Sequence, residues 1–147
     1  MVAWPSGAPT AVLRAAIAPP GAPRFAPATV VSPLPAPFDL ALTAAPSGFV
    51  ALWPILASHP ESGWRLALAP PGARLLDSGR VSDPFLEGYG VDARDAAVFG
   101  DRRGNVTAVW VQPPAVPPPG PPTPGAPPQA PPVWTLQAAE AIVLPPR

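Results

Sequence analysis

The sequence has no cysteine, no lysine and a single histidine, and only 12% of its 147 residues are charged. The absence of cysteine excludes a disulfide framework, thiolate catalysis and cysteine-based zinc or iron–sulfur sites. Nine arginines balance nine carboxylates, so the chain also lacks the basic surplus that is typical of a nucleic-acid-binding domain. We therefore expect no nucleic-acid partner, and no motif in the sequence indicates a cofactor.

Long apolar runs are scarce as well. The first residues have neither an early basic residue nor the continuous apolar stretch of a signal peptide, because prolines interrupt them. The most apolar window, residues 48–57, is about half as long as a bilayer-spanning helix must be, and it contains Pro54. We expect synthesis in the cytoplasm, no membrane insertion, and a buried strand pair or a strand and turn in this window.

Proline is the most unusual component that is present, with 29 residues against an average usage of about 5%. This content predicts few helices. Nevertheless 48% of the residues are hydrophobic, which is the opposite of the composition that keeps a chain disordered. Arginine is the sole basic residue besides His59, and alanine and proline are abundant. This bias indicates a GC-rich bacterial source.

The distribution of proline divides the chain into four parts. Residues 1–37 contain nine prolines, and we expect a proline-rich N-terminal arm with one or two strands. Residues 38–112 contain six and form the expected β domain. Residues 113–132 contain twelve and no charge, which predicts a polyproline II strut. Residues 133–147 are expected to be a C-terminal docking strand or short helix.

Alternating hydrophobicity predicts strands in the central part. Phe38, Leu40 and Leu42 alternate with less apolar residues, and residues 64–68 repeat this pattern. Residues 96–99 and 106–111 flank a polar link that contains two glycines, which predicts a hairpin. The predicted fold is all-β: a small antiparallel β-sandwich or barrel-like domain with extended proline-rich N-terminal and C-terminal arms.

The residues with catalytic or metal-binding chemistry do not form a recognisable site. His59 lies between two apolar segments, and no Gly-x-Ser-x-Gly motif accompanies it, so we expect an exposed turn residue. Asp92, Asp95 and Asp101 are candidate calcium ligands, but their spacing differs from an EF-hand and arginines lie among them. We expect a solvated surface of arginine–carboxylate pairs here. No catalytic, cofactor or metal residue is assigned.

The apolar residues of the flanking parts are the candidate binding residues. Trp64 and Trp110 follow strand patterns and are expected in the core, whereas Trp4 and Trp134 have proline-rich neighbours and are expected to anchor the arms or a partner. A central part of only 75 residues also needs additional packing to be stable. The candidate partner-binding residues are Trp4, Phe25, Pro117, Pro121, Trp134, Leu136 and Ile142.

These observations favour a non-enzymatic structural protein that binds other protein subunits, in a homo- or hetero-oligomeric assembly. A phage or phage-like particle is the expected assembly, with this chain as a decoration, connector, spike or tail component, and the virion as its location. A carbohydrate-binding or adhesion module is the alternative, since five tryptophans are available. A small hydrolase that uses His59 or the acidic segment is the second alternative.

Overall fold

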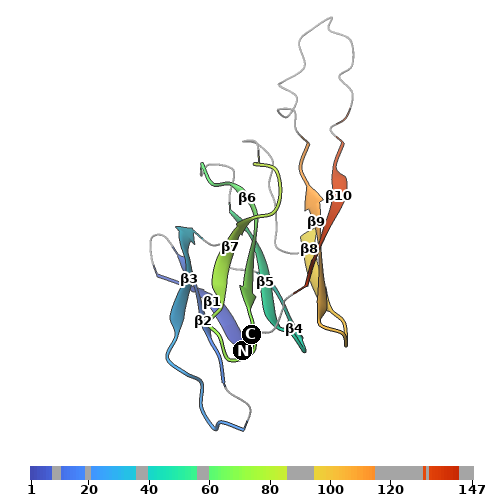
Figure 1. Ribbon diagram of the computed structural model, residues 1–147. Coiled ribbons are helices and arrows are strands. Elements are labelled where there is room, and N and C mark those ends of the chain that lie inside the picture. Colours follow the sequence, from blue (N-terminus) through green and yellow to red (C-terminus); the bar gives the residue numbers. More distant parts are fainter. Residues whose placement is uncertain are drawn as a thin grey trace, which may run out of the picture.

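The computed structural model describes residues 1–7, 11–18, 21–35, 40–55, 60–85, 95–114, 131 and 133–142. All regular elements in this part of the chain are strands, and every strand pairing is antiparallel (Figure 1). The strands are β1 (Val2–Ser6), β2 (Val12–Ala16), β3 (Thr29–Pro35), β4 (Ala41–Ala45), β5 (Gly48–Ile55), β6 (Gly63–Ala69), β7 (Leu76–Arg80), β8 (Ala96–Gly100), β9 (Asn105–Gln112) and β10 (Thr135–Ile142).

The strands form three sheets. The middle sheet has the order β4-β5-β6-β7, the first outer sheet β1-β2-β3, and the second outer sheet β10-β9-β8. In Figure 1 the first outer sheet lies on one side of the middle sheet and the second outer sheet on the other. The three sheets thus make a three-layered antiparallel sandwich, and the all-β fold class predicted from the sequence is confirmed.

The middle sheet is buried on both faces because its two inner strands are apolar at nearly every position. In β5, Ala51 and Trp53 belong to one core cluster, whereas Val50 and Leu52, which alternate with them along the strand, belong to the other. Successive side chains of a strand point to opposite faces, so the two clusters lie on opposite sides of the sheet. A continuous apolar run is typical of such a doubly buried strand. Residues 48–55 of the expected window form the single strand β5, so a strand pair is not formed there, and the expected turn falls outside the described residues.

The first outer sheet covers one face of the middle sheet. Its inward side chains, which include Leu13, Ala15 and Val31, pack on Trp53 and Ile55 of β5. Leu13 and Trp53 have no exposed surface. Residues 1–37, expected to be an arm with one or two strands, contain three strands whose sheet is a full layer of the domain. The physical reason is that this layer covers an apolar face that would otherwise be exposed to water.

The second outer sheet covers the opposite face. Val106, Ala108 and Trp110 of β9 pack on Leu52 and Trp64 of the middle sheet. The alternation of buried and partly exposed residues along β9 agrees with the predicted strand and with a core position for Trp110. The hairpin expected between residues 96 and 111 is formed by β8 and β9.

The alternation of apolar residues along β4 does not put Leu42 in a core. Leu42 is exposed, whereas Ala41 and Ala45 pack against the second core, which lies between the middle sheet and the second outer sheet. The small inward residues allow β8 to approach β4 closely. A Cβ atom on Gly100 of β8 would lie 2.8 Å from the Cβ of Ala45.

The C-terminal segment was expected to be a docking strand or a short helix. It is the strand β10, and it pairs with β9 of its own chain over its full length, from Thr135 opposite Gln112 to Ile142 opposite Asn105. Apart from Pro113, Pro114 and Pro131, the expected polyproline II strut at 113–132 lies outside the described residues. The described residues on either side of it are the ends of a β-hairpin.

Candidate functional site

The outer face of the first outer sheet is largely apolar. Because Leu13 and Ala15 of β2 point into the core, Arg14 between them points outward. The strand register places Arg14 directly between Trp4 of β1 and Val30 of β3. Trp4 is 36% exposed and Val30 43%, and Arg14 is the only charged side chain within these three strands. We call this surface the N-terminal face; it consists of Val2, Trp4, Arg14 and Val30.

The outer face of the second outer sheet has the same character with the opposite charge. The register places Phe99 of β8, Thr107 of β9 and Glu140 of β10 in one row. Phe99 is 59% exposed and Leu136 of β10 is 74% exposed. Glu140 is the only charged side chain within these three strands. We call this surface the C-terminal face; it consists of Ala97, Phe99, Thr107, Val109, Val111, Leu136, Ala138 and Glu140.

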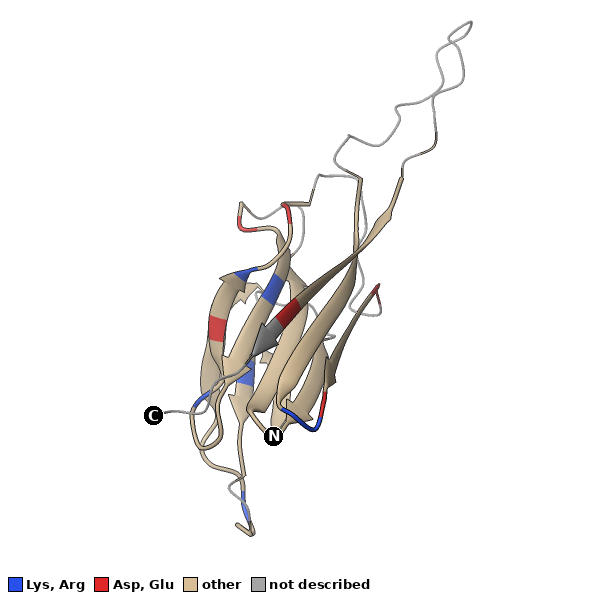
Figure 2. Cartoon of the chain, turned by 45° about the vertical axis from the view of Figure 1, so that its right-hand side comes forward, with Lys and Arg blue, Asp and Glu red and all other residues tan. Residues whose placement is uncertain are grey.

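Charged residues are sparse elsewhere too, and they lie mostly in loops and on the middle sheet (Figure 2). The best-formed ion pair joins Arg65 of β6 to Asp77 of β7, with 2.9 Å between Nε and Oδ2. Both side chains are nearly buried, and the Asp77 carboxylate also accepts a hydrogen bond from the Gly79 amide. This pair connects two strands of the middle sheet and lies on neither outer face.

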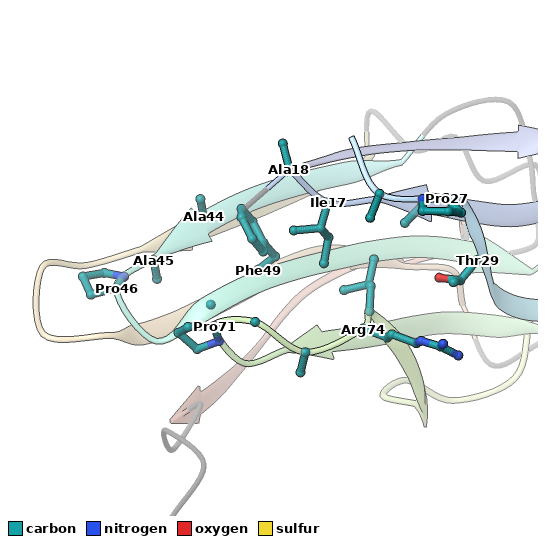
Figure 3. Close-up of a pocket in the computed structure, with 16 residues that line it drawn as sticks. Ile17, Ala18, Pro27, Thr29, Ala44, Ala45, Pro46, Phe49, Pro71 and Arg74 are labelled. Carbon is teal, nitrogen blue, oxygen red and sulfur yellow. The ribbon is translucent and has the colours of Figure 1, made fainter. Parts of the chain in front are cut away.

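An apolar cavity of about 590 Å³ lies at one end of the sandwich. Three segments form its wall (Figure 3). They are the end of β2 and the following Ile17 and Ala18, the turn between β4 and β5, which contains Pro46, and the loop between β6 and β7, which contains Pro71. The described residues that line it are Ala15, Ile17, Ala18, Ala26, Pro27, Thr29, Ala44, Ala45, Pro46, Gly48, Phe49, Pro71, Gly72, Ala73, Arg74 and Leu75.

The chemistry of this lining is that of a contact surface. Among its described residues, Thr29 carries the only hydroxyl group and Arg74 the only charge. Neither has a carboxylate or histidine beside it in the lining, and general acid–base or nucleophilic catalysis needs such a pair. The cavity can accommodate an apolar group, and its described lining offers no reacting group.

Two of the three acidic residues considered as metal ligands, Asp95 and Asp101, lie in the described part of the chain. Asp92 lies outside the described residues, and within the described part no group of three acidic, histidine or cysteine side chains can hold a metal ion. Asp101 instead organises the turn between β8 and β9. Its carboxylate accepts hydrogen bonds from the amides of Arg103 and Asn105, at 2.8 and 2.9 Å, and from the Asn105 side chain at 2.7 Å. The bond from the Asn105 side chain is the main cause that lowers the pKa of Asp101.

The predicted partner-binding residues are distributed over different parts of the molecule. Trp4 lies on the N-terminal face, and Leu136 lies on the C-terminal face. Trp134, which is 42% exposed, directly precedes β10. Phe25 is exposed in the connection between β2 and β3. Ile142 is the last residue of β10, paired with Asn105.

Pro117, Pro121 and His59 lie outside the described residues. Of the tryptophans, Trp53, Trp64 and Trp110 are buried, and Trp4 and Trp134 belong to different outer layers. Phe99 and Glu140 are not among the candidate residues predicted from the sequence. The available signal was the alternation along the β8–β9 hairpin, which places Phe99 on the side opposite to the core residues.

Comparison of the chain with protein-family models, with curated proteins and with solved structures gives no match. Across the described ranges, no helix has the length and apolar character that crossing a membrane requires.

Proposed function

We propose that this chain is a non-enzymatic structural subunit of a large protein assembly. The observation that carries the proposal is the pair of apolar outer faces. Each outer sheet buries one side against the middle sheet and leaves large hydrophobic residues, such as Trp4 and Phe99, exposed on the other. The largest exposed apolar patch of a protein is often functional, and protein–protein contact is one function of such patches.

The proposed assembly is a phage or phage-like particle, in which the chain acts as a decoration, connector, spike or tail component. Its arginine-only basic composition favours a GC-rich bacterial source. The low charge and the apolar outer faces favour a protein that is in stable contact with other subunits. In this proposal the chain is made in the cytoplasm and is located in the assembled particle.

Particle fractionation tests the proposal. Cells or particle preparations that naturally contain the chain are separated on a density gradient, and the chain is detected with an antibody. Sedimentation of the chain with a complex of megadalton size is the expected result. If the chain remains in the slowly sedimenting soluble fraction, the assembly proposal is wrong. Binding of the same chain to a glycan array would then support the carbohydrate-binding alternative.

A further inference from the structure

We infer that copies of this chain stack head to tail, the N-terminal face of one copy packing on the C-terminal face of the next. This inference rests on the proposed function and names the partner of the two faces. The inward sides of the outer sheets are occupied by the two cores, so the outer faces point away from each other. A contact between these two unlike faces is heterologous, and repetition of it produces an open row or a ring.

The charges determine which faces can pair. Each face carries one charged side chain within its strands, Arg14 on the N-terminal face and Glu140 on the C-terminal face. Contact between two N-terminal faces would bury two arginines in an apolar interface, and contact between two C-terminal faces would bury two glutamates. Burying like charges together is costly. Only the head-to-tail contact pairs an arginine with a carboxylate.

The charged side chains are also available for such a pairing. Among the described residues, the ion pairs involve Glu61, Arg65 and Asp77, and neither Arg14 nor Glu140 takes part in one. Each charge has an exposed aromatic residue in its row. Trp4 is directly opposite Arg14, and Phe99 shares the row of Thr107 with Glu140. An arginine on an aromatic ring gains further attraction.

The contact would continue the architecture that the chain already has. Within one copy, two sheets pack face to face against the middle sheet, as in other β-sandwiches, where the layers are about 10 Å apart. Contact between the C-terminal face of one copy and the N-terminal face of the next adds another sheet-on-sheet layer of this kind. No strand has to change its pairing, because the contact uses side chains and leaves the sheet edges as they are.

The size of the faces predicts the strength of the contact. Three strands about 4.8 Å apart, with five to eight residues at about 3.3 Å each, present a face of roughly 300 Å². A stable dimer usually buries about 800 Å² per partner. The head-to-tail contact is therefore weak between two isolated copies, and it gains effective strength where many copies are held together.

Charge-exchange variants test this inference on the purified full-length chain. Wild-type protein should show a weight-average mass that rises over roughly 10 to 500 µM in sedimentation equilibrium, as expected for a weak interface. Arg14→Glu and Glu140→Arg should each weaken the association about tenfold or more, because each creates a like-charge contact. The double variant, with both exchanges, should associate as the wild type does.

An equimolar mixture of the two single variants provides the decisive measurement. In Arg14→Glu both faces are acidic, and in Glu140→Arg both are basic. Neither variant should stack alone, but the mixture should form alternating rows and recover the wild-type mass. Recovery also proves that both variants are folded. The matched controls are Arg24→Glu and Asp83→Arg, which make the same charge changes at exposed positions in loops, and they should leave the association unchanged.

Three results would overturn the inference: a wild-type chain that stays monomeric throughout the range, a closed dimer that neither single exchange weakens, or a mixture of single exchanges that remains monomeric. These results concern only stacking between copies. The assembly proposal fails separately, when the chain does not sediment with a particle. A chain that is monomeric alone but sediments with a particle would keep the proposed function and assign both faces to other subunits.

Discussion

The indole Nε1 of Trp64 donates a hydrogen bond to the main-chain carbonyl oxygen of Val111, 3.1 Å away. Trp64 lies in β6 of the middle sheet and Val111 in β9 of the second outer sheet, so the bond crosses the sandwich. The Trp64 ring also packs edge to face on Phe85, with 6.1 Å between the centroids. The hydrogen bond therefore links the two layers, and the ring contact holds the Trp64 side chain against the segment that follows β7.

Replacing Trp64 by phenylalanine should test the polar part of this link. Trp64→Phe removes the donor to the Val111 carbonyl, and losing such a buried hydrogen bond costs about 1 to 2 kcal/mol in addition to the loss of volume. Trp110→Phe is the matched control, because the buried Nε1 of Trp110 has no hydrogen-bond partner in the described structure. Urea unfolding should show the larger loss of stability for Trp64→Phe. Equal losses would mean that the hydrogen bond contributes nothing.

Trp110→Ala should destabilise the fold by about 3 to 5 kcal/mol, the usual cost of truncating a buried large aromatic residue. Trp110 is only 2% exposed and belongs to the second core. Thermal unfolding of the variant measures the effect. An unchanged midpoint would place Trp110 on the solvent side of β9 and reverse the two sides assigned to that strand.

The close approach of β8 to β4 predicts that Gly100 tolerates no side chain. A Cβ atom there would lie 2.8 Å from the Ala45 Cβ and 3.0 Å from the Ala44 carbonyl oxygen. Gly100→Val should therefore destabilise the protein by about 1 to 3 kcal/mol, as overpacking usually does. Ala97→Val, in the same strand but on the outer face, is the control and should change the free energy of unfolding by less than about 0.5 kcal/mol. Similar losses in both variants would contradict the close packing of these strands.

Asp101 should titrate below its ordinary pKa of 3.8, because the Asn105 side chain and nearby amides donate hydrogen bonds to its carboxylate. A folded-state pKa below the unfolded value means that this group contributes stability above pH 3.8, and that the contribution is lost as the pH falls through the lower folded value. Carbon-detected NMR titration measures the shift. In Asn105→Ala the pKa should return toward 3.8, and an unshifted wild-type Asp101 would refute the hydrogen-bond network.

The antiparallel all-β fold could be predicted because it depends on local signals. The alternation along residues 64–68 and 106–111 is visible directly in the sequence, and so is the glycine-containing link between β8 and β9. The packing of sheet on sheet is not local. The chain pattern shows that Leu13 and Trp53 are apolar, but it does not show that they meet across two layers, and hence residues 1–37 were expected as an arm.

The two outer faces were only partly predictable for the same reason. Trp4 and Leu136 were predicted from the sequence as partner-binding residues, and both are exposed. The role of Glu140 depends on the register, because only the pairing of Glu140 with Thr107, and of Thr107 with Phe99, places the carboxylate in one row with Phe99. A single charge in an alanine-rich segment has no distinguishing signal in the sequence.

The last prediction concerns the proline-rich segment between β9 and β10. Gln112 and Thr135 are paired residues of adjacent strands, so the segment joins two points that lie close together. Replacing residues 115–130 by a four-residue Gly/Asn turn should therefore keep the fold, and the shorter loop should raise the free energy of unfolding by up to about 1 kcal/mol, since loop closure costs less entropy.

Ending the chain at residue 112 should instead unfold it, because β9 loses its partner β10 and the second core loses part of its cover. Near-ultraviolet circular dichroism and thermal unfolding distinguish the two variants. If the chain that ends at residue 112 retained its tertiary signal, β10 would be dispensable for the fold and free to act on a neighbouring subunit. Particle fractionation of the short-loop variant then separates folding from assembly: a folded variant that fails to join the particle would show that the proline-rich segment itself makes a subunit contact.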